Sequence, residues 1–357
     1  MMPRPAARLV PMADVLAFLT QVARPLEPQR VPLSEAVGGV LAQPLVVPSP
    51  VPREATALQA GYAVASSALV GVSSYAPLAL TVELPWVEAG GILPPGADAV
   101  LPPDAVTAHG AYTEVLAEVS PGENICRPGE DAPRGAILMQ EGDAFLPTHL
   151  AIARAAGLSQ AVLRRPRVGI VATEEDRIDL RAAFHSAELG GDVVQLSHDE
   201  VLGRSGPPAD LVIAATYDAG LVETILRNAD HVAARRIALR PGEATQVASL
   251  KGVPVVAMLP RLDVLFAVSR CILQPFLRHI AGARPRATRR LGPLGRKLSS
   301  SLGLTEVALL RDAGQGVEPL GVGVFDLPAL AAARFWSALP PESEGHPAGE
   351  MIDAFEI

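Results

Sequence analysis

The chain has few cysteines and no long apolar run, and each shortage excludes a class of protein. Cys126 and Cys271 lie far apart without CxxC spacing, so they indicate neither a zinc site nor a disulfide framework and fit a reducing cytoplasm. No apolar run reaches the ~18 residues of a membrane-spanning helix, and no signal-peptide core is visible, so we expect a cytoplasmic protein without a membrane partner. The net charge of −8 argues against a nucleic-acid partner, because phosphate binding needs concentrated Lys and Arg.

Aromatic residues make up only 4% of the chain, so its cores are expected to consist of Ala, Val and Leu. A length of 357 residues exceeds one ordinary core and predicts roughly two to four domains. The 34 prolines indicate many loops and domain junctions, because proline lacks an N–H. A basic run at 284–290 is interpreted as a solvated linker in preference to an anion site. Four histidines lack mutual ligand spacing and predict no metal cluster, namely His185, His198, His231 and His279.

The hydrophobic pattern changes along the chain from helical to β-rich and then to strand–helix alternation. Residues 12–23 have the spacing of an amphipathic helix, and short apolar runs over 61–118 predict a β-rich lobe. A helix resumes at 148–156, so we expect the lobe to be inserted into the first domain. Glycine-rich short segments after 284 predict a small β-barrel. Between them, buried parallel strands covered by helices are predicted, with strands at 168–172, 192–196, 210–215 and 253–259 and helices at 179–189 and 219–228.

Several motifs occur in a fixed order and carry a family resemblance. They are found at 90–100 (GGILPPGADAV), 121–168, which includes Gly129-Glu130-Asp131, and 341–350 (PESEGHPAGE). In these motifs the chain resembles the MoeA/gephyrin-E family of molybdopterin molybdotransferases, which insert molybdate into the dithiolene of molybdopterin. The resemblance implies an α/β plus β multidomain fold, divided into an elongated N-terminal linker domain (1–43 and 136–165), an inserted β-rich lobe (44–135), an α/β molybdopterin-binding-type domain (166–283) and a C-terminal small β-barrel (284–357).

The chemistry of this family requires groups that the chain has partly lost. Holding phosphate and molybdate needs cations and backbone N–H groups, and Mg²⁺ beside a phosphoanhydride needs carboxylates. In the lobe motif at 56–63 the family's reactive aspartate is Ala60, which can neither bind a metal nor accept a proton. After the first α/β strand, Glu174 replaces a glycine, while Glu175 and Asp176 keep two acids. An anion in place of that glycine opposes the approach of a phosphate.

Three further loops depart from the family pattern. The loop at 214–220 lacks the glycine pair, and we expect Tyr217 to fill space where a pterin or phosphate would lie. In the turn at 240–244 one cation is retained as Arg240, whereas Glu243 reverses the charge of the other. In the loop at 259–265, Arg261 either captures an anion or pairs with Asp263, and both interpretations stay open.

The polar residues that survive define a candidate site. The resemblance implies two carboxylates, Glu130 and Asp131, as possible metal ligands, and Asp131 and Asp176 as possible catalytic acids. It also implies a set of pterin-, nucleotide- or oxyanion-binding residues, namely Thr173, Glu175, Asp176, Thr216, Asp218, Arg240 and Arg261.

Three functions fit this pattern. The first is a non-catalytic homodimer, with the lobe of one subunit over the α/β domain of the other. It binds molybdopterin, its adenylylated form or the finished cofactor, or docks on a molybdoenzyme or cofactor-biosynthesis protein. The second is a divergent molybdotransferase that uses Mg²⁺ and molybdate, with substitutes at Asp131, Glu175, Asp176, Arg240 and Arg261. The third is a structural maturation partner whose pocket is filled by Tyr217, Leu262 and Leu265.

Overall fold

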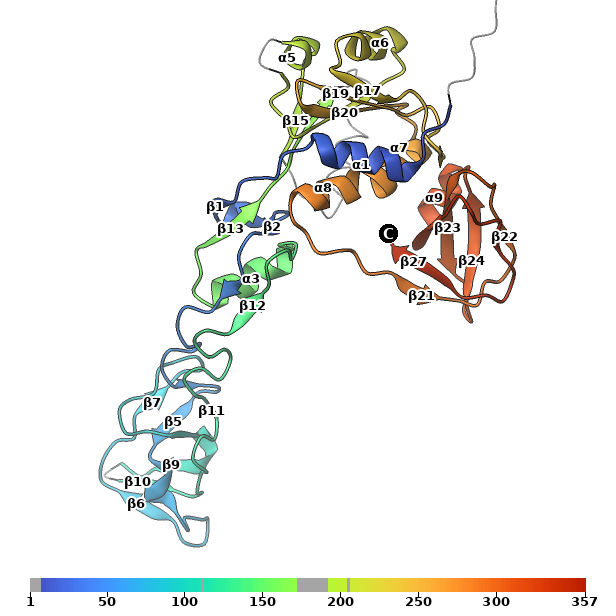
Figure 1. Ribbon diagram of the computed structural model, residues 1–357. Coiled ribbons are helices and arrows are strands. Elements are labelled where there is room, and N and C mark those ends of the chain that lie inside the picture. Colours follow the sequence, from blue (N-terminus) through green and yellow to red (C-terminus); the bar gives the residue numbers. More distant parts are fainter. Residues whose placement is uncertain (1–7, 111, 172–191, 204–205) are drawn as a thin grey trace, which may run out of the picture.

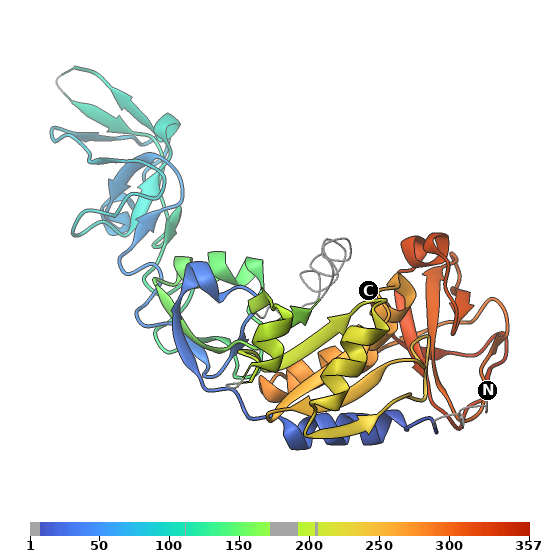
Figure 2. The ribbon, with the colours of Figure 1, turned by 90° about the horizontal axis from the view of Figure 1, so that it is seen from above.

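Three groups of elements follow one another along an elongated molecule (Figure 1). A β-rich lobe lies at one end, an α/β sheet lies in the middle and a β-barrel lies at the other end, and a view from above shows the same order (Figure 2). The structure, a computed structural model, describes residues 8–110, 112–171, 192–203 and 206–357.

The chain passes twice through a small region between the lobe and the α/β sheet. On the outward pass it forms β1 (Gln29–Pro32), α2 (Leu33–Ala36), β2 (Val40–Leu41) and β3 (Leu45–Val46). On the return it forms β12 (Ile137–Met139), α3 (Pro147–Ala155) and β13 (Gln160–Arg164). Strand β13 lies between β1 and β2, and β12 pairs antiparallel with β3. Because β3 and β12 bracket the lobe, the lobe is an insertion, as the sequence predicts.

The inserted lobe consists of short strands because Gly and Pro interrupt its apolar runs. Its sheets have the orders β7-β5-β8, β6-β10-β9 and β11-β4. At Gly61 an added Cβ would lie 2.1 Å from the carbonyl oxygen of Leu101, so only glycine allows β5 to approach β8 there. The elements are β4 (Thr56–Ala57), β5 (Gly61–Val64), η1 (Ser66–Leu69), β6 (Leu78–Leu80), β7 (Trp86–Val87), β8 (Ala99–Leu101), η2 (Pro103–Ala105), β9 (Val106–Ala108), β10 (Thr113–Val115) and β11 (Ile125–Cys126).

Asp98 connects η1 to the start of β8. Its carboxylate accepts hydrogen bonds from the Ser66 backbone N–H at 2.6 Å and from the Ser66 hydroxyl at 2.8 Å. These bonds, the backbone one foremost, lower the pKa of Asp98 from its ordinary 3.8. Because the folded pKa is depressed, the stabilisation is fully present above pH 3.8 and is lost as the pH falls through the folded value.

The Asp98→Ala variant is therefore expected to lose about 1 kcal/mol of unfolding free energy at neutral pH, because two hydrogen bonds to a charged but solvent-accessible group disappear. The difference from the unsubstituted protein is expected to vanish in acid. Urea unfolding followed by circular dichroism over a pH series that descends from pH 7 through the folded pKa of Asp98 measures both effects. Asp104→Ala, an exposed acid of η2, is the matched control, and equal losses in the two variants would contradict the assignment.

The middle of the described chain forms a six-stranded sheet of order β15-β14-β16-β20-β19-β17. Strands β15, β14, β16 and β20 are parallel, and every residue of β16 is buried, as continuous apolar runs indicate. The antiparallel strands β19 and β17 were not predicted from the sequence. The bounds are β14 (Arg167–Val171), β15 (Asp192–Gln195), β16 (Leu211–Ala215), β17 (His231–Ala234), β19 (Gln246–Leu250) and β20 (Val253–Met258).

Helices cover both faces of this sheet, because alternate strand residues point to opposite sides. Ile213 packs with α1 (Met12–Val22), α7 (Leu262–Val268), the π-helix η3 (Ser269–Leu273) and α8 (Gln274–Ile280). The neighbouring Val212 packs with α5 (His198–Leu202) and α6 (Ala219–Arg227) on the other face. The helices predicted at 12–23 and 219–228 are confirmed. The helix predicted at 179–189 lies outside the described residues.

The barrel is joined to the α/β sheet by a strand that comes from the α/β part of the sequence. Strand β18 (Leu239–Arg240) pairs parallel with β23, so the turn after β18 lies against the barrel. The sheet order is β18-β23-β25-β27-β21, with β24 paired to β23. The other elements are β21 (Arg289–Leu291), β22 (Leu298–Ser299), β23 (Thr305–Asp312), β24 (Val317–Val322), α9 (Leu327–Ala332), β25 (Phe335–Leu339), β26 (Gly345–His346) and β27 (Ile352–Glu356).

The basic run at 284–290 connects α8 to β21, and its arginines contact carboxylates. Arg284 lies 3.1 Å from Asp143, and Arg290 lies 3.1 Å from Asp353. These ion pairs favour the linker interpretation of the run. The residue boundaries expected for the four domains stay predictions. Among the described residues, no helix is both long and apolar enough to span a bilayer.

Candidate functional site

A cleft of about 290 Å³ lies between the turn after β18, the residues that follow β20, and the end of β24. In α/β sheets, ligands bind outside the carboxyl ends of the parallel strands, and Leu259 directly follows β20 there. The cleft brings together two of the predicted anion-binding residues, Arg240 and Arg261. Its described lining consists of Arg240, Pro241, Gly242, Glu243, Ala244, Thr245, Leu259, Arg261, Asp263, Val264, Gly323 and Val324.

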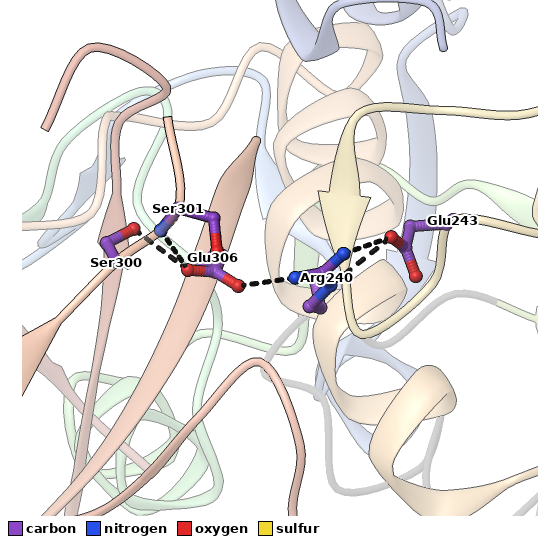
Figure 3. Close-up of polar contacts among 5 residues, drawn as sticks. All are labelled: Arg240, Glu243, Ser300, Ser301 and Glu306. Carbon is purple, nitrogen blue, oxygen red and sulfur yellow. Dashed lines mark hydrogen bonds and ion pairs between the residues drawn. The ribbon is translucent and has the colours of Figure 1, made fainter. Parts of the chain in front are cut away.

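Arg240 lies between two carboxylates (Figure 3). Its guanidinium donates to Glu243 at 2.7 and 3.2 Å and to Glu306 of β23 at 3.3 Å. Glu306 is 4% exposed and also accepts from the Ser300 hydroxyl at 3.0 Å and the Ser301 backbone N–H at 2.6 Å. Donation to Glu243, and secondarily the contact with Glu306, raises the pKa of Arg240 above its ordinary value. Glu243 and Glu306 therefore occupy positions around the guanidinium that a bound oxyanion would otherwise take.

Gly323 makes this arrangement possible. It lies just after β24 with a φ of +67°, and an added Cβ would lie 2.8 Å from both Arg240 Cδ and Glu306 Oε1. A residue with a side chain would therefore collide with the ion pair and would also be strained in the backbone. The glycine lets the barrel approach closely enough for Glu306 to reach Arg240.

Arg261 forms a two-bond pair with Asp263. Its Nε donates to Oδ1 at 3.1 Å and its Nη2 donates to Oδ2 at 2.9 Å. Asp263 is 7% exposed and also accepts from the Val264 backbone N–H at the first turn of α7. The hydrogen bonds to Asp263 raise the pKa of Arg261. Of the two interpretations left open by the sequence, the structure shows the ion pair.

The cleft also contains a buried hydroxyl that no protein group satisfies. Thr245 is 1% exposed and lines the cleft, and its Oγ1 has no hydrogen-bond partner among the described residues. Buried polar atoms are rarely left unpaired, because the lost contact with water costs free energy. The hydroxyl is therefore a ready contact for a polar ligand atom.

Thr216 and Asp218 have local structural contacts rather than contacts in the cleft. The Thr216 hydroxyl accepts from the Asp218 backbone N–H, and the Asp218 carboxylate caps α6 by accepting from Gly220 and Leu221. Asp218 is thus an ordinary N-cap residue. Neither residue lines the cleft in the described lining.

Tyr217, Leu262 and Leu265, which were expected to fill the pocket, are absent from the described lining of this cleft. The Tyr217 side chain is 66% exposed and Leu262 is 43% exposed. Leu262 and Leu265 line a different cleft, between α7 and α9. The loop after β16 carries Tyr217 into solvent because Asp218 begins α6 immediately after it. The predicted residues Thr173, Glu175 and Asp176, together with Glu174, lie outside the described residues.

Glu130 and Asp131 follow β11 of the lobe, whereas Arg240 belongs to β18, which pairs with the barrel strand β23. The lobe and the barrel lie at opposite ends of the elongated molecule (Figure 1). Glu130 accepts a hydrogen bond from the Arg127 backbone N–H at 2.7 Å. Burial first, and then the negative charges of Asp131 and Glu130, raises the pKa of the Cys126 thiol beside them. The described residues contain no group of three or more side chains arranged to hold a metal ion. The role of Glu130 and Asp131 as Mg²⁺ ligands stays a prediction, since Mg²⁺ is commonly held by only one or two carboxylates together with water or substrate.

Two residues that shape the cleft were missed in the sequence analysis. Glu306 lies in an apolar strand, and a lone acid in a run such as Thr305–Leu310 is the signal that marks a buried, partnered carboxylate. Thr245 gave no signal, because its importance depends on burial. Ala60 lies half-buried in the bend between β4 and β5, where its methyl group offers no polar atom.

An inserted lobe, a largely parallel α/β sheet with a cleft beyond its carboxyl edge, and a terminal barrel define a class of multidomain protein known from solved structures. The molybdopterin biosynthesis MoeA protein of Pyrococcus horikoshii has this fold, with a TM-score of 0.70 at 22% identity, covering 98% of this chain and 100% of that one. The structure of a molybdenum cofactor biosynthesis protein from Pyrococcus furiosus matches with a TM-score of 0.59 at 17% identity and covers 97% of this chain and 99% of its own.

Sequence matches agree with the fold. Residues 10–157 match the model of the MoeA N-terminal region, domains I and II. Molybdopterin molybdenumtransferase 2 of Mycobacterium tuberculosis is 28% identical over 322 residues, which cover 75% of this chain and 78% of the relative. Molybdopterin molybdenumtransferase of Staphylococcus aureus is 21% identical over 403 residues, covering 96% and 94%. Residues 10–157 therefore carry the MoeA N-terminal region, and the chain as a whole has the fold of the MoeA structures.

Proposed function

We propose that this protein acts in molybdenum-cofactor biosynthesis or handling, and that it binds molybdopterin or the cofactor without inserting molybdate efficiently. The observation that carries this proposal is the pairing of both cleft arginines. Three carboxylates, Glu243, Glu306 and Asp263, neutralise Arg240 and Arg261. An incoming molybdate or phosphate would meet a surface of net negative formal charge, whereas oxyanion transfer depends on prearranged positive charge.

Retention of ligand binding is supported by the cleft itself. It is an open cavity of about 290 Å³ with an unsatisfied buried hydroxyl at Thr245, and neither Tyr217 nor Leu262 fills it. A purely structural protein has no need of such a cavity. We therefore favour a ligand-binding protein over a structural maturation partner.

A homodimer is part of the proposal. In one chain the lobe acids at 130–131 and the cleft at Arg240 lie in different parts of an elongated molecule. A second copy, with its lobe over the α/β sheet of the first, would bring the two regions together. Ala60 in the lobe would still supply no carboxylate, which supports binding in preference to catalysis.

The decisive experiment is a calorimetric titration of the purified protein with molybdopterin and with adenylylated molybdopterin, followed by incubation with molybdate and Mg²⁺. We expect saturable binding of at least one pterin with no molybdate-dependent product. Turnover, or rescue of a strain that lacks the authentic transferase, would overturn the proposal in favour of a divergent enzyme. Absence of binding to either pterin would favour a protein that acts through its surface.

A further inference from the structure

A groove of about 230 Å³ lies in the inserted lobe, at the end of the molecule away from the barrel (Figure 2). Its lining comes from β5, η1 and β6 and from the segments that lead into β7 and β8. The groove is smaller than the roughly 300–1,000 Å³ of small-molecule sites, and its described lining has no polar side chain to orient such a ligand. All described lining residues are apolar or glycine, among them Ala68, Leu69, Leu78, Leu80, Leu84 and Pro95.

The part of the sequence that forms this groove contains no basic residue. Between Arg53 and Arg127 the chain has eight Asp and Glu but no Lys or Arg, although the whole chain has 30 Lys and Arg. These eight acids equal the net charge of −8 of the whole chain, so positive and negative residues balance elsewhere. In the described part of the chain, only Glu114 of the eight belongs to an ion pair, with His109 at 3.2 Å. The negative charge of the lobe is therefore almost uncompensated.

Three of these acids adjoin the segments that line the groove, and all three are exposed. Glu83 directly precedes a leucine of the lining, and Asp98 directly follows an alanine of the lining. Glu118 accepts a hydrogen bond from the Gly71 backbone N–H at 2.9 Å, two residues after the end of η1. Protein interfaces have the same arrangement of an apolar centre and a polar rim.

The negative charge determines which occupant fits the groove. It repels anionic ligands, nucleic acid and anionic membrane surfaces. A second copy of the chain offers no net positive charge outside the lobe, and in its basic run Arg284 and Arg290 already pair with Asp143 and Asp353. A basic segment of a different protein complements the acids, and an apolar side chain of that segment can fill the groove as an anchor.

We propose that the groove of the lobe is a docking site for a partner protein, which contributes a segment with a leucine- or phenylalanine-type anchor flanked by Lys or Arg. The anchor lies in the groove, and the cations lie toward Glu83, Asp98 and Glu118. Electrostatic complementarity of this kind speeds association and selects the partner more than it adds affinity. This docking site is independent of the ligand binding proposed above for the cleft at Arg240.

Fluorescence anisotropy of a labelled synthetic peptide, KKLFKKLFKK, titrated with the full-length protein measures this docking. We expect saturable binding that weakens as the salt concentration rises. The peptide KKGSKKGSKK keeps the cations without the anchors, and EELFEELFEE keeps the anchors but reverses the charge. Each is expected to bind at least about tenfold more weakly. Absence of saturable binding of KKLFKKLFKK at low salt, or equal binding of the peptide without anchors, overturns the proposal.

Substitutions then locate the binding. Ala68 is an exposed lining residue of η1, and Ala68→Trp is expected to fill the groove and weaken binding of KKLFKKLFKK at least about tenfold. Ala65→Phe, at an exposed lining residue just before η1, gives a second test if Ala68→Trp fails to fold. Glu83→Gln is expected to weaken binding about threefold, whereas Glu342→Gln, at an exposed acid after β25, leaves it unchanged. Binding that both groove variants leave unaffected, or an equal loss in Glu342→Gln and Glu83→Gln, overturns the proposal.

Discussion

The Glu243→Lys variant is expected to bind adenylylated molybdopterin at least about tenfold more tightly than the unsubstituted protein. The substitution removes the nearer of the two carboxylates on Arg240, which lies 2.7 Å away, and adds a third cation to the cleft beside Arg240 and Arg261. A unit charge at ~4 Å is worth roughly 4 kcal/mol at an effective dielectric constant near 20. Because Glu243 is partly exposed, solvent screening reduces this gain, and tenfold corresponds to only about 1.4 kcal/mol.

Calorimetric titrations at two salt concentrations measure this change. The gain is expected to shrink as salt rises, because it is electrostatic. Glu223→Lys on α6 makes the same change of charge at an acid outside the cleft lining and is the matched control. An unchanged affinity in Glu243→Lys, or an equal gain in Glu223→Lys, would show that the charge of the turn after β18 does not limit the binding of adenylylated molybdopterin.

The Arg240→Ala variant is expected to lose about 2–3 kcal/mol of unfolding free energy. Glu306 is 4% exposed and would keep its hydrogen bonds from Ser300 and Ser301 while losing its ion pair with Arg240. Removing one member of a buried pair leaves a buried charge without a cationic partner, and two hydrogen bonds compensate it only in part. The partial exposure of Arg240 places the expected loss below that of a fully buried pair.

Urea unfolding followed by Trp336 fluorescence in a Trp86→Phe background measures this loss near its origin, because β25 pairs directly with β23. Arg311→Ala on the same strand breaks an exposed pair with Glu318 and is expected to change stability little. Adding Glu306→Gln to Arg240→Ala is expected to restore part of the loss, since the neutral amide needs no cation. Strictly additive losses would contradict the proposed coupling.

Elements with strong periodicity could be predicted from the sequence. The parallel strands β14, β16 and β20 have apolar runs that match their burial on both faces, β15 has an apolar run at the edge of the sheet, and the helix over 12–23 has a regular apolar face. Strand β17 was missed because it forms one edge of the sheet, whereas β19 was missed although four of its five residues are buried. In β17 most residues are only partly buried, so its pattern resembles that of a loop.

Only the contacts of the candidate site between residues close in sequence could be predicted. Arg240 and Glu243 lie three residues apart, and Arg261 and Asp263 lie two residues apart, so both pairs could be weighed from local sequence. Glu306 lies 66 residues from Arg240. Their contact depends on β18 joining the barrel sheet and on the absence of a side chain at Gly323, and no local pattern contains that information.

In the lobe motif at 56–63, the residues that the fold requires differ from the residue that the family's chemistry uses. Gly61 is required where β5 approaches β8, and Tyr62 packs edge-on against Trp86 at 5.1 Å. Position 60 lies in a bend outside the paired strands, and the lobe keeps its sheets with only a methyl group there. The architecture is therefore indifferent to the presence of an acid at this position, and a single codon change could return a carboxylate to a lobe already built to present it.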